Sequence, residues 1–154
     1  MPTYEFCGAE PREWDGYVSS GGTESNLQAL WCYRNELRAR YKLNDDEILV
    51  VCSEGTHYSV AKACNILNLD QLVLNVVDDT RSIYLARAAM QLRKKVASGV
   101  RALIIVFNMG TTMFGSVDDP DGLLDLTATF ELPTRVHVDA AFGGFIYPRQ
   151  DHLR

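Results

Sequence analysis

The sequence predicts an α/β fold in which a mostly parallel sheet is flanked by helices. The first observation is that apolar runs of strand length alternate with segments of helical periodicity from residue 16 onward. The second is that the runs at 47–52 and 101–107 are apolar at almost every position, as in strands buried on both faces. The third is that no repeat or low-complexity linker interrupts the order, which is typical of one α/β unit.

The first half of the chain is predicted to contain two strands and two helices. Residues 16–20 are expected to form a short strand that the following Gly-Gly pair interrupts. A helix is predicted from about residue 23 to residue 41, then a strand over 47–52 and a helix over 57–67. The predicted apolar faces of the two helices are Leu27, Leu30, Trp31 and Leu37, and Val60, Ala61, Cys64 and Leu67.

The second half continues the alternation with three strands and two helices. The strands are predicted at residues 71–77, 101–107 and 135–138. Between the first two strands, Asp79 and Thr80 are predicted to cap a helix that Gly99 ends. The apolar face of that helix is predicted to carry Leu85, Ala89, Leu92 and Val96. A turn-rich loop over 115–121 and a short helix over 123–130 are predicted before the last strand.

Charge and composition exclude several classes of partner. The 154 residues carry a formal net charge of −5, and the longest basic run, 93–95, lies at a predicted helix end. A nucleic acid or an anionic membrane needs clustered lysine and arginine, so neither is expected as a partner. Residues 1–14 do not resemble a secretory signal, and no apolar run is long enough to cross a membrane. A cytoplasmic location is therefore predicted.

The cysteines indicate neither a disulfide framework nor a metal site. The four residues are Cys7, Cys32, Cys52 and Cys64. They have no C-x-x-C spacing, and three of them fall in apolar segments. Buried, reduced thiols in a cytosolic protein are the expected state, with no bound metal.

Candidate functional residues follow the ends of the predicted strands, because ligands of parallel sheets bind beyond the carboxyl ends of the strands. Segment 19–26 (SSGGTESN) opens a helix, and its glycines, hydroxyl groups and free N–H groups suit a phosphate. A plain glycine turn with Thr23 as the N-cap is the alternative. The segment lacks the G-x-G-x-x-G order of dinucleotide-binding folds and the P-loop pattern.

Two further segments place polar side chains at the same edge. His57 follows the second predicted strand and opens a helix, where an imidazole can stack on a flat ligand or move a proton. Thr111 and Thr112 follow the strand over 101–107 and can bond the polar edge of a ligand. A satisfied structural histidine and a turn with bonded hydroxyls are the alternatives.

Asp139 ends the last predicted strand and precedes two alanines and two glycines. A buried carboxylate costs free energy unless it is paired. The pyridine nitrogen of pyridoxal-5′-phosphate (PLP) would be such a partner, because an ionised aspartate keeps that nitrogen protonated and the ring then accepts electrons. The small residues leave room for a flat ring. A capping or turn aspartate is the alternative.

Four segments in this order resemble the group II PLP-dependent amino-acid decarboxylases, which have fold type I. The segments are 21–26 (GGTESN), 56–62 (THYSVAK), 108–112 (NMGTT) and 137–145 (HVDAAFGGF). The resemblance extends from Gly16 to Pro148. It implies a partial large domain of a fold type I PLP enzyme, and a complete enzyme that is a carboxy-lyase forming an amine and carbon dioxide from an amino acid.

The resemblance also implies a role for each matching residue. Gly22 and Thr23 would contact the cofactor phosphate, and His57 would stack on the cofactor ring. Thr111 or Thr112 would bond the cofactor, and both remain candidates.

The last motif supplies the two remaining cofactor contacts. Asp139 would pair with the pyridine nitrogen, and Ala141 would pack against the ring. Among all these residues, His57 and Asp139 are the candidate catalytic residues.

The resemblance implies that residues 1–15 are a short N-terminal lead and that 16–154 are a partial PLP-binding domain. The lysine that holds PLP as a Schiff base in this family follows the last motif, and the chain ends at Arg154 before it. The C-terminal small domain is also expected to be absent. The chain alone is therefore expected to bind PLP weakly and to catalyse no decarboxylation, and the complete enzyme to be a homodimer.

Two other functions remain open. One is a different fold type I PLP lyase, acting on a phosphorylated substrate. The other is a non-catalytic binding or assembly module that kept the fold. The sequence does not indicate which amino acid would be the substrate.

Overall fold

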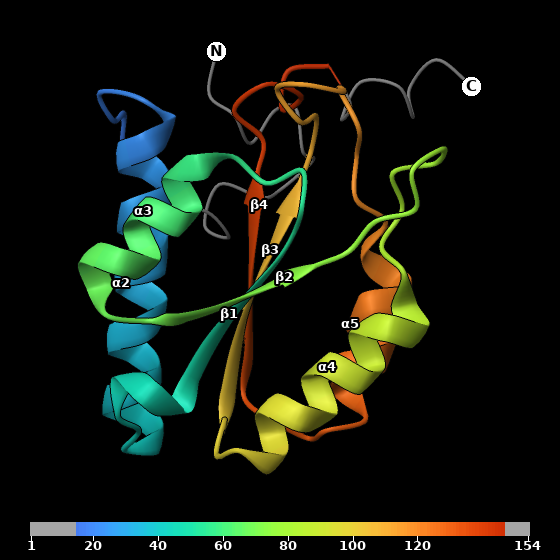
Figure 1. The fold of residues 1–154 in the computed structure, drawn as a ribbon. Coiled ribbons are helices and arrows are strands. Elements are labelled where there is room, and N and C mark those ends of the chain that lie inside the picture. The colour runs from blue at the N-terminus through green and yellow to red at the C-terminus, as the bar shows by residue number, and fades with distance from the viewer. Residues whose placement is uncertain (1–14, 147–154) are drawn as a thin grey trace.

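The computed structural model describes residues 15–146, which form a four-stranded parallel sheet with helices on both faces (Figure 1). The strands are β1 (Ile48–Ser53), β2 (Asp70–Leu74), β3 (Ala102–Asn108) and β4 (Thr134–Asp139). The helices are α2 (Gly22–Tyr41), α3 (Tyr58–Leu67), α4 (Leu85–Ala97) and α5 (Pro120–Ala128), with a 3-10 turn η1 at Asp45–Glu47. The predicted α/β architecture with a mostly parallel sheet is confirmed.

The strand order is β2-β1-β3-β4, and all three pairings are parallel. The chain leaves β1 through α3 to reach β2 on one side, then returns through α4 to β3 on the other side. β1 and β3 are therefore adjacent strands whose connections run in opposite directions. Such a switch point opens a crevice at the carboxyl ends of the two strands, where ligands bind in open α/β sheets.

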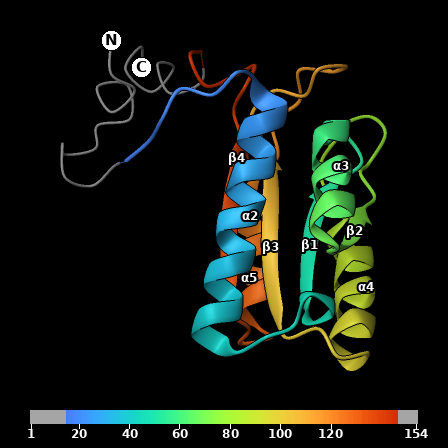
Figure 2. The ribbon, with the colours of Figure 1, turned by 90° about the vertical axis from the view of Figure 1, so that its left-hand side faces the viewer.

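The core has two layers because β1 and β3 are buried on both faces. In β1, Ile48, Val50 and Cys52 belong to the cluster under α2 and α3, while Leu49 and Val51 belong to the cluster under α4 and α5. Figure 1 shows α2 and α3 on one side of the sheet and α4 and α5 on the other, and Figure 2 views the sheet from the side of α2 and α3. This explains the uninterrupted apolar run in the sequence, since both alternating sets of side chains are buried.

The buried faces of α2 and α3 differ from the predicted apolar faces. On α2 the buried residues are Asn26, Leu30 and Leu37, and Trp31 is 44 % exposed. On α3, Ala63 is buried in place of Ala61. Helix spacing alone does not show where the sheet lies, so a stripe predicted one residue off is a natural error.

The predicted strand over 16–20 is wrong. These residues are irregular, and Val18 is 99 % exposed. A strand needs a neighbour that accepts its backbone hydrogen bonds, and none of the four strands pairs with this segment.

Two boundaries also differ from the prediction. β2 ends at Leu74 rather than residue 77, and Asp79 and Thr80 do not cap α4, whose N-cap is Tyr84. Instead, the Val77 N–H donates to the Ser82 carbonyl, so these polar residues form a turn.

The start of α5 was predicted too late, while the end of α4 was predicted correctly. α5 begins at Pro120, where the Asp119 side chain accepts a hydrogen bond from the Asp121 N–H. Gly99 follows α4 with φ +113°, as expected for the residue that ends a helix.

Three remaining predictions concern cysteines, membranes and the lead segment. Cys52 and Cys64 are buried free thiols, whereas Cys32 is exposed. Among residues 15–146, no helix combines the length and apolarity needed to span a membrane. The predicted N-terminal lead, 1–15, lies almost entirely outside the described residues.

Candidate functional site

All seven residues predicted as site residues line one cavity of about 240 Å³ at the carboxyl edge of the sheet. They are Gly22, Thr23, His57, Thr111, Thr112, Asp139 and Ala141. They come from the N-terminal ends of α2 and α3, the loop after β3, the end of β4 and the loop that follows it. Five residues to which the sequence analysis gave no role complete the lining: Asn26, Gly55, Asn108, Gly110 and Phe142.

The N-terminus of α2 forms one wall of this cavity. Its N-cap is Gly21 and has no side-chain cap, so Thr23 lies inside the helix and the alternative of Thr23 as N-cap is wrong. A Cβ built on Gly22 would lie 3.5 Å from the Ala141 Cβ, so the first turn of α2 lies directly against the loop after β4. An uncapped N-terminus of a 20-residue helix favours an anion through its N–H groups and dipole.

His57 is the N-cap of α3, as its predicted position at the start of a helix implies. The His57 Nδ1 accepts a hydrogen bond from the Ser59 N–H at 3.3 Å and lies 2.7 Å from the Ser59 Oγ. The ring is half-buried and lines the cavity. These bonds hold the imidazole at the carboxyl end of β1, so the structural and functional interpretations of His57 are compatible.

Asn26 connects the histidine to the aspartate and is 3 % exposed. Its Nδ2 donates to the Ser59 Oγ at 2.9 Å and to the Asp139 Oδ2 at 2.8 Å, while its Oδ1 lies 2.8 Å from the His137 Nε2. The sequence contained a signal for this residue. Asn26 shares the buried face of α2 with Leu30 and Leu37, where a polar side chain needs a partner.

Asp139 accepts a hydrogen bond within the turn after β4 and also lines the cavity. Its Oδ1 accepts from the Ala141 N–H at 3.2 Å, and its Oδ2 accepts from Asn26. The carboxylate keeps unused lone pairs on both oxygens, since each can accept more than one hydrogen bond. Asp139 can therefore also accept from a cationic N–H group placed in the cavity.

His137 lies two residues before Asp139, on the same face of β4, because side chains alternate along a strand. Burial lowers the pKa of His137 below its usual range, and the nearby charge of Asp139 opposes that shift. No role was assigned from the sequence to His137, which opens the motif 137–145 within the last strand. Its bond to Asn26 joins it to the polar network behind the cavity.

The two threonines differ in how their hydroxyls are engaged. Thr111 is buried, and its Oγ1 accepts from the Ser116 N–H at 3.1 Å and lies 2.8 Å from the Ser116 Oγ. Thr112 is exposed and also lines the cavity. The predicted turn with bonded hydroxyls is therefore present at Thr111.

A second buried polar cluster joins the ends of β1 and β3. The Asp118 Oδ2 accepts from the Asn108 N–H at 2.8 Å and from the Asn108 Nδ2 at 2.6 Å. The Ser53 Oγ donates to the Asp118 Oδ1 at 3.2 Å, and the Asn108 Nδ2 donates to the Thr56 Oγ1 at 3.0 Å. Asn108 lines the cavity, so this cluster supports its floor.

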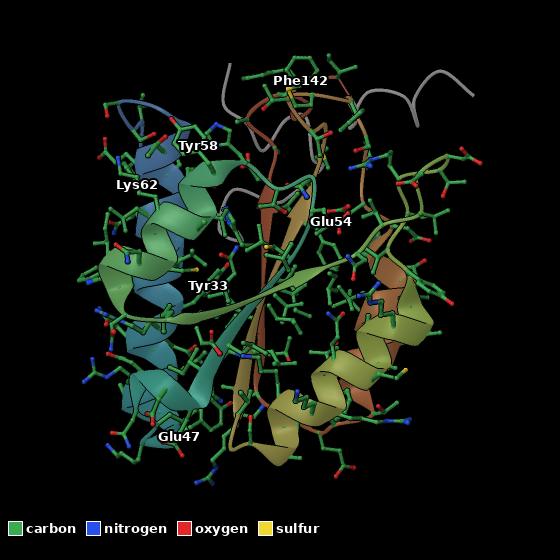
Figure 3. The ribbon with its side chains drawn as sticks, in the orientation of Figure 1. Tyr33, Glu47, Glu54, Tyr58, Lys62 and Phe142 are labelled. Carbon is green, nitrogen blue, oxygen red and sulfur yellow. The ribbon has the colours of Figure 1, made fainter. Side chains whose placement is uncertain are left out.

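No lysine lines the cavity in the described part of the chain. Lys42, Lys62 and Lys94 are exposed, and Lys95 forms an ion pair with Asp70. Figure 3 shows Lys62 on the outer side of α3 and Phe142 beyond the carboxyl ends of the strands. The cavity therefore offers an anion-binding helix end, an imidazole, a carboxylate and small residues.

The sequence matches the family model of the pyridoxal-dependent decarboxylase conserved domain over residues 4–154. It is 43 % identical over 136 residues to a tryptophan decarboxylase of Clostridium sporogenes, covering 88 % of this chain and 33 % of that protein. A probable L-aspartate decarboxylase of Halobacterium salinarum is 35 % identical, with 89 % and 34 % covered. A histidine decarboxylase of Acinetobacter baumannii is 33 % identical, with 89 % and 33 % covered. The chain thus spans about a third of the length of these relatives.

Solved structures share the fold. The glutamate decarboxylase domain of a Vibrio parahaemolyticus protein superposes with a TM-score of 0.70 at 25 % identity, covering 82 % of this chain and 29 % of that one. The Oryza sativa TDC with PLP and tryptamine superposes with a TM-score of 0.77 at 20 % identity, and the match covers 92 % of this chain and 31 % of that one. The Burkholderia pseudomallei sphingosine-1-phosphate lyase superposes with a TM-score of 0.75 at 23 % identity, and the match covers 98 % of this chain and 34 % of that one.

Proposed function

The chain belongs to the pyridoxal-dependent decarboxylase family, and we propose that it forms the cofactor-binding part of an amino-acid carboxy-lyase. The complete enzyme would convert an amino acid to an amine and carbon dioxide. One observation carries this proposal. The switch point of the sheet brings the uncapped end of α2, the His57 imidazole and the Asp139 carboxylate to one cavity.

The residues of the cavity fit PLP in charge and shape. The backbone N–H groups of Gly22 and Thr23 at the start of α2 suit the phosphate, because that helix end lacks a side-chain cap. The Gly22 position lies within contact of Ala141, so the wall here is built from small groups. A flat ring could lie between His57 and Ala141, and its polar edge could meet Thr111 or Thr112.

Asp139 would hold a proton at the ring nitrogen of the cofactor. Its carboxylate is positioned by two donors, Asn26 and the Ala141 N–H, and keeps lone pairs for a third. When bound, PLP supplies an electron sink for the charge left on the substrate carbon as carbon dioxide departs. The negative charge of Asp139 favours the protonated ring nitrogen and so strengthens that sink.

His57 would cover one face of the ring and present an N–H or lone pair near the reacting atoms. Because no described lysine lines the cavity, we propose that this chain supplies non-covalent contacts to the cofactor. Turnover would then need residues beyond those described, which agrees with a chain that spans a third of its relatives.

The test uses the protein encoded by the complete reading frame that contains this chain. PLP binding is followed by absorbance, and carbon dioxide release is measured with tryptophan, aspartate, histidine, tyrosine and glutamate. Asp139→Asn, which keeps the shape and removes the charge, is expected to lower turnover by at least about a hundredfold. Asp125→Asn, on the exposed face of α5, is the matched control.

The unchanged protein should bind PLP and release carbon dioxide from at least one of these amino acids. Failure to bind PLP would overturn the proposal and favour the non-catalytic module. PLP binding with cleavage of a phosphorylated substrate, and no carbon dioxide, would favour the other fold type I lyase. Full activity in Asp139→Asn would remove the proposed role of that carboxylate.

A homodimer remains our proposal for the complete enzyme. Large apolar side chains are exposed around the loops at the carboxyl edge: Met113, Phe114, Phe142, Phe145 and Ile146. Exposed apolar surface of this kind favours association, which supports the proposal. Sedimentation of the complete protein tests it, and a monomer at micromolar concentration would contradict it. The cytoplasmic location also remains a prediction, which cell fractionation can test.

A further inference from the structure

We propose that Asn26 is a positioning residue that sets the proton arrangement behind the cavity, acting on Asp139 and His137 directly and on His57 through Ser59. The proposal rests on the proposed function only where these side chains are said to meet PLP. The proton arrangement itself stands on the hydrogen bonds of the described residues.

The orientation of the Asn26 amide follows from Asp139. An ionised carboxylate only accepts hydrogen bonds, so the Asn26 atom 2.8 Å from the Asp139 Oδ2 must be the NH₂ group. The second hydrogen of that group points to the Ser59 Oγ at 2.9 Å. The remaining atom, Oδ1, is an acceptor and faces the His137 Nε2 at 2.8 Å. His137 must therefore carry a proton on Nε2.

Ser59 fixes the position of the His57 proton in the same way. Because the Ser59 Oγ accepts from Asn26, its own hydrogen is free to donate to the His57 Nδ1, 2.7 Å away. The Ser59 N–H also points at Nδ1, at 3.3 Å. Two donors meet at Nδ1, so this atom carries the lone pair. The proton of the neutral His57 ring is then on Nε2, on the side of the ring away from Ser59.

Burial favours this one arrangement of protons over the alternatives. Asn26 is 3 % exposed and Ser59 is fully buried, so water cannot replace a lost partner. Both amide hydrogens and one lone pair of Asn26 are engaged. Turning the amide over would set its oxygen against the Asp139 carboxylate and leave its NH₂ group facing His137. Such buried, unsatisfied groups cost free energy, so one proton arrangement is strongly favoured.

The experiment measures the histidine tautomers by nitrogen-15 NMR in the complete protein, with PLP affinity as a second readout. Three variants separate the branches: Asn26→Asp, Asn26→Leu and Ser59→Ala. Asn65→Leu, at an exposed position of α3, is the control. His57→Gln and His137→Gln assign the two signals.

In the unchanged protein we expect both histidines to carry the proton on Nε2. Asn26→Asp keeps an acceptor for His137 and removes the donor to Asp139, so the His137 tautomer should persist while PLP affinity falls. Asn26→Leu removes both the acceptor for His137 and the donor to Asp139. It should give mixed tautomers at His137 and roughly a ten- to hundredfold loss of PLP affinity. Ser59→Ala removes the hydroxyl donor and leaves only the longer backbone N–H contact at the His57 Nδ1, so the Nδ1-protonated tautomer should gain population at His57 only. Asn65→Leu should change neither readout.

An Nδ1 proton on either histidine in the unchanged protein would overturn the proposal. So would unchanged tautomers in both Asn26→Leu and Ser59→Ala. If Asn26→Leu does not fold, the Ser59→Ala result decides, because only the proposed network predicts a change at His57 that spares His137. Absence of PLP binding in the unchanged protein would defeat the proposed function, while the tautomers would still decide this inference.

Discussion

Polar side chains are buried at one edge of the sheet and accessible to water at the other. At the carboxyl edge, four polar residues are buried in two bonded pairs, Asn26 with Ser59 and Asn108 with Asp118. At the amino edge, charged side chains lie in ion pairs that water reaches, such as the exposed Arg101 with the partly exposed Glu47 at 3.5 Å. Figure 3 shows Glu47 at this end, far from Phe142. The difference is access to water rather than the number of polar groups.

This difference indicates where the chain carries function. A buried polar group is costly unless its hydrogen bonds are made, whereas a solvated charge costs little. The carboxyl edge keeps its polar groups at the switch point between β1 and β3, where the strand ends open a cavity. We therefore expect substitutions at this edge to have large effects and equivalent substitutions at the amino edge to have small ones.

The largest effect is expected from Asp118→Ala. The substitution removes the acceptor for the Asn108 backbone N–H, the Asn108 side chain and the Ser53 hydroxyl, and leaves three buried donors without it. The free energy of unfolding should fall by about 3 kcal/mol. Urea denaturation of the complete protein measures the change.

Asp125→Ala, at an exposed position of α5, is the control for Asp118→Ala. It should change the free energy of unfolding by less than about 0.5 kcal/mol. Equal losses in the two variants would show that the buried cluster does not stabilise the fold.

The next effect concerns pH and His137. Burial lowers the pKa of the folded-state His137 below the unfolded value of about 6.5. Above that value neither state binds the proton, and no stability is lost. As the pH falls, the unfolded state is protonated first, so stability decreases until the pH has passed the folded-state pKa.

His137→Gln keeps a side-chain N–H donor for Asn26 and cannot titrate. The variant should therefore lose less stability than the unchanged protein between about pH 7 and pH 5. The glutamates with lowered pKa, Glu24 and Glu36, are present in both proteins and cancel in the comparison. Parallel loss of stability in the two proteins over this range would contradict the role of His137. Urea denaturation at several pH values gives the measurement.

The smallest effect is expected at the amino edge, from Lys95→Ala. Lys95 pairs with Asp70, whose side chain is 55 % exposed, and such surface pairs contribute less than about 1 kcal/mol. The small loss should shrink further in high salt, because salt screens exposed charges. A loss as large as that of Asp118→Ala, measured by the same denaturation, would remove the contrast between the two edges.

The sequence located the central strands well and the outer elements less well. The predicted strands 47–52 and 101–107 match β1 (Ile48–Ser53) and β3 (Ala102–Asn108) to within one residue at each end. Strands buried on both faces must be apolar throughout, so the sequence marks them clearly. Residues 16–20 (GYVSS) contain two large apolar side chains, Tyr17 and Val18, but no strand pairs with them, and composition alone does not show whether a segment has a neighbouring strand.

The starts of α4 and α5 were predicted less accurately than the central strands. α5 begins at an Asp-Pro pair, Asp119 and Pro120, a local N-cap signal that was available in the sequence. α4 begins after a turn that is closed by a hydrogen bond between Val77 and Ser82. The polar residues of that turn, Asp79 and Thr80, have the composition of an N-cap, which explains the wrong prediction.

The amino-acid sequence by itself determined the α/β class, the family and seven of the twelve residues that line the cavity, because strand ends of a parallel sheet share an edge. Only the tertiary structure decided which groups support those residues. Asn26 meets Asp139 across 113 positions of sequence, and Ser53 meets Asp118 across 65. Hydrogen bonds of this kind depend on distances of about 3 Å between segments that local periodicity cannot place.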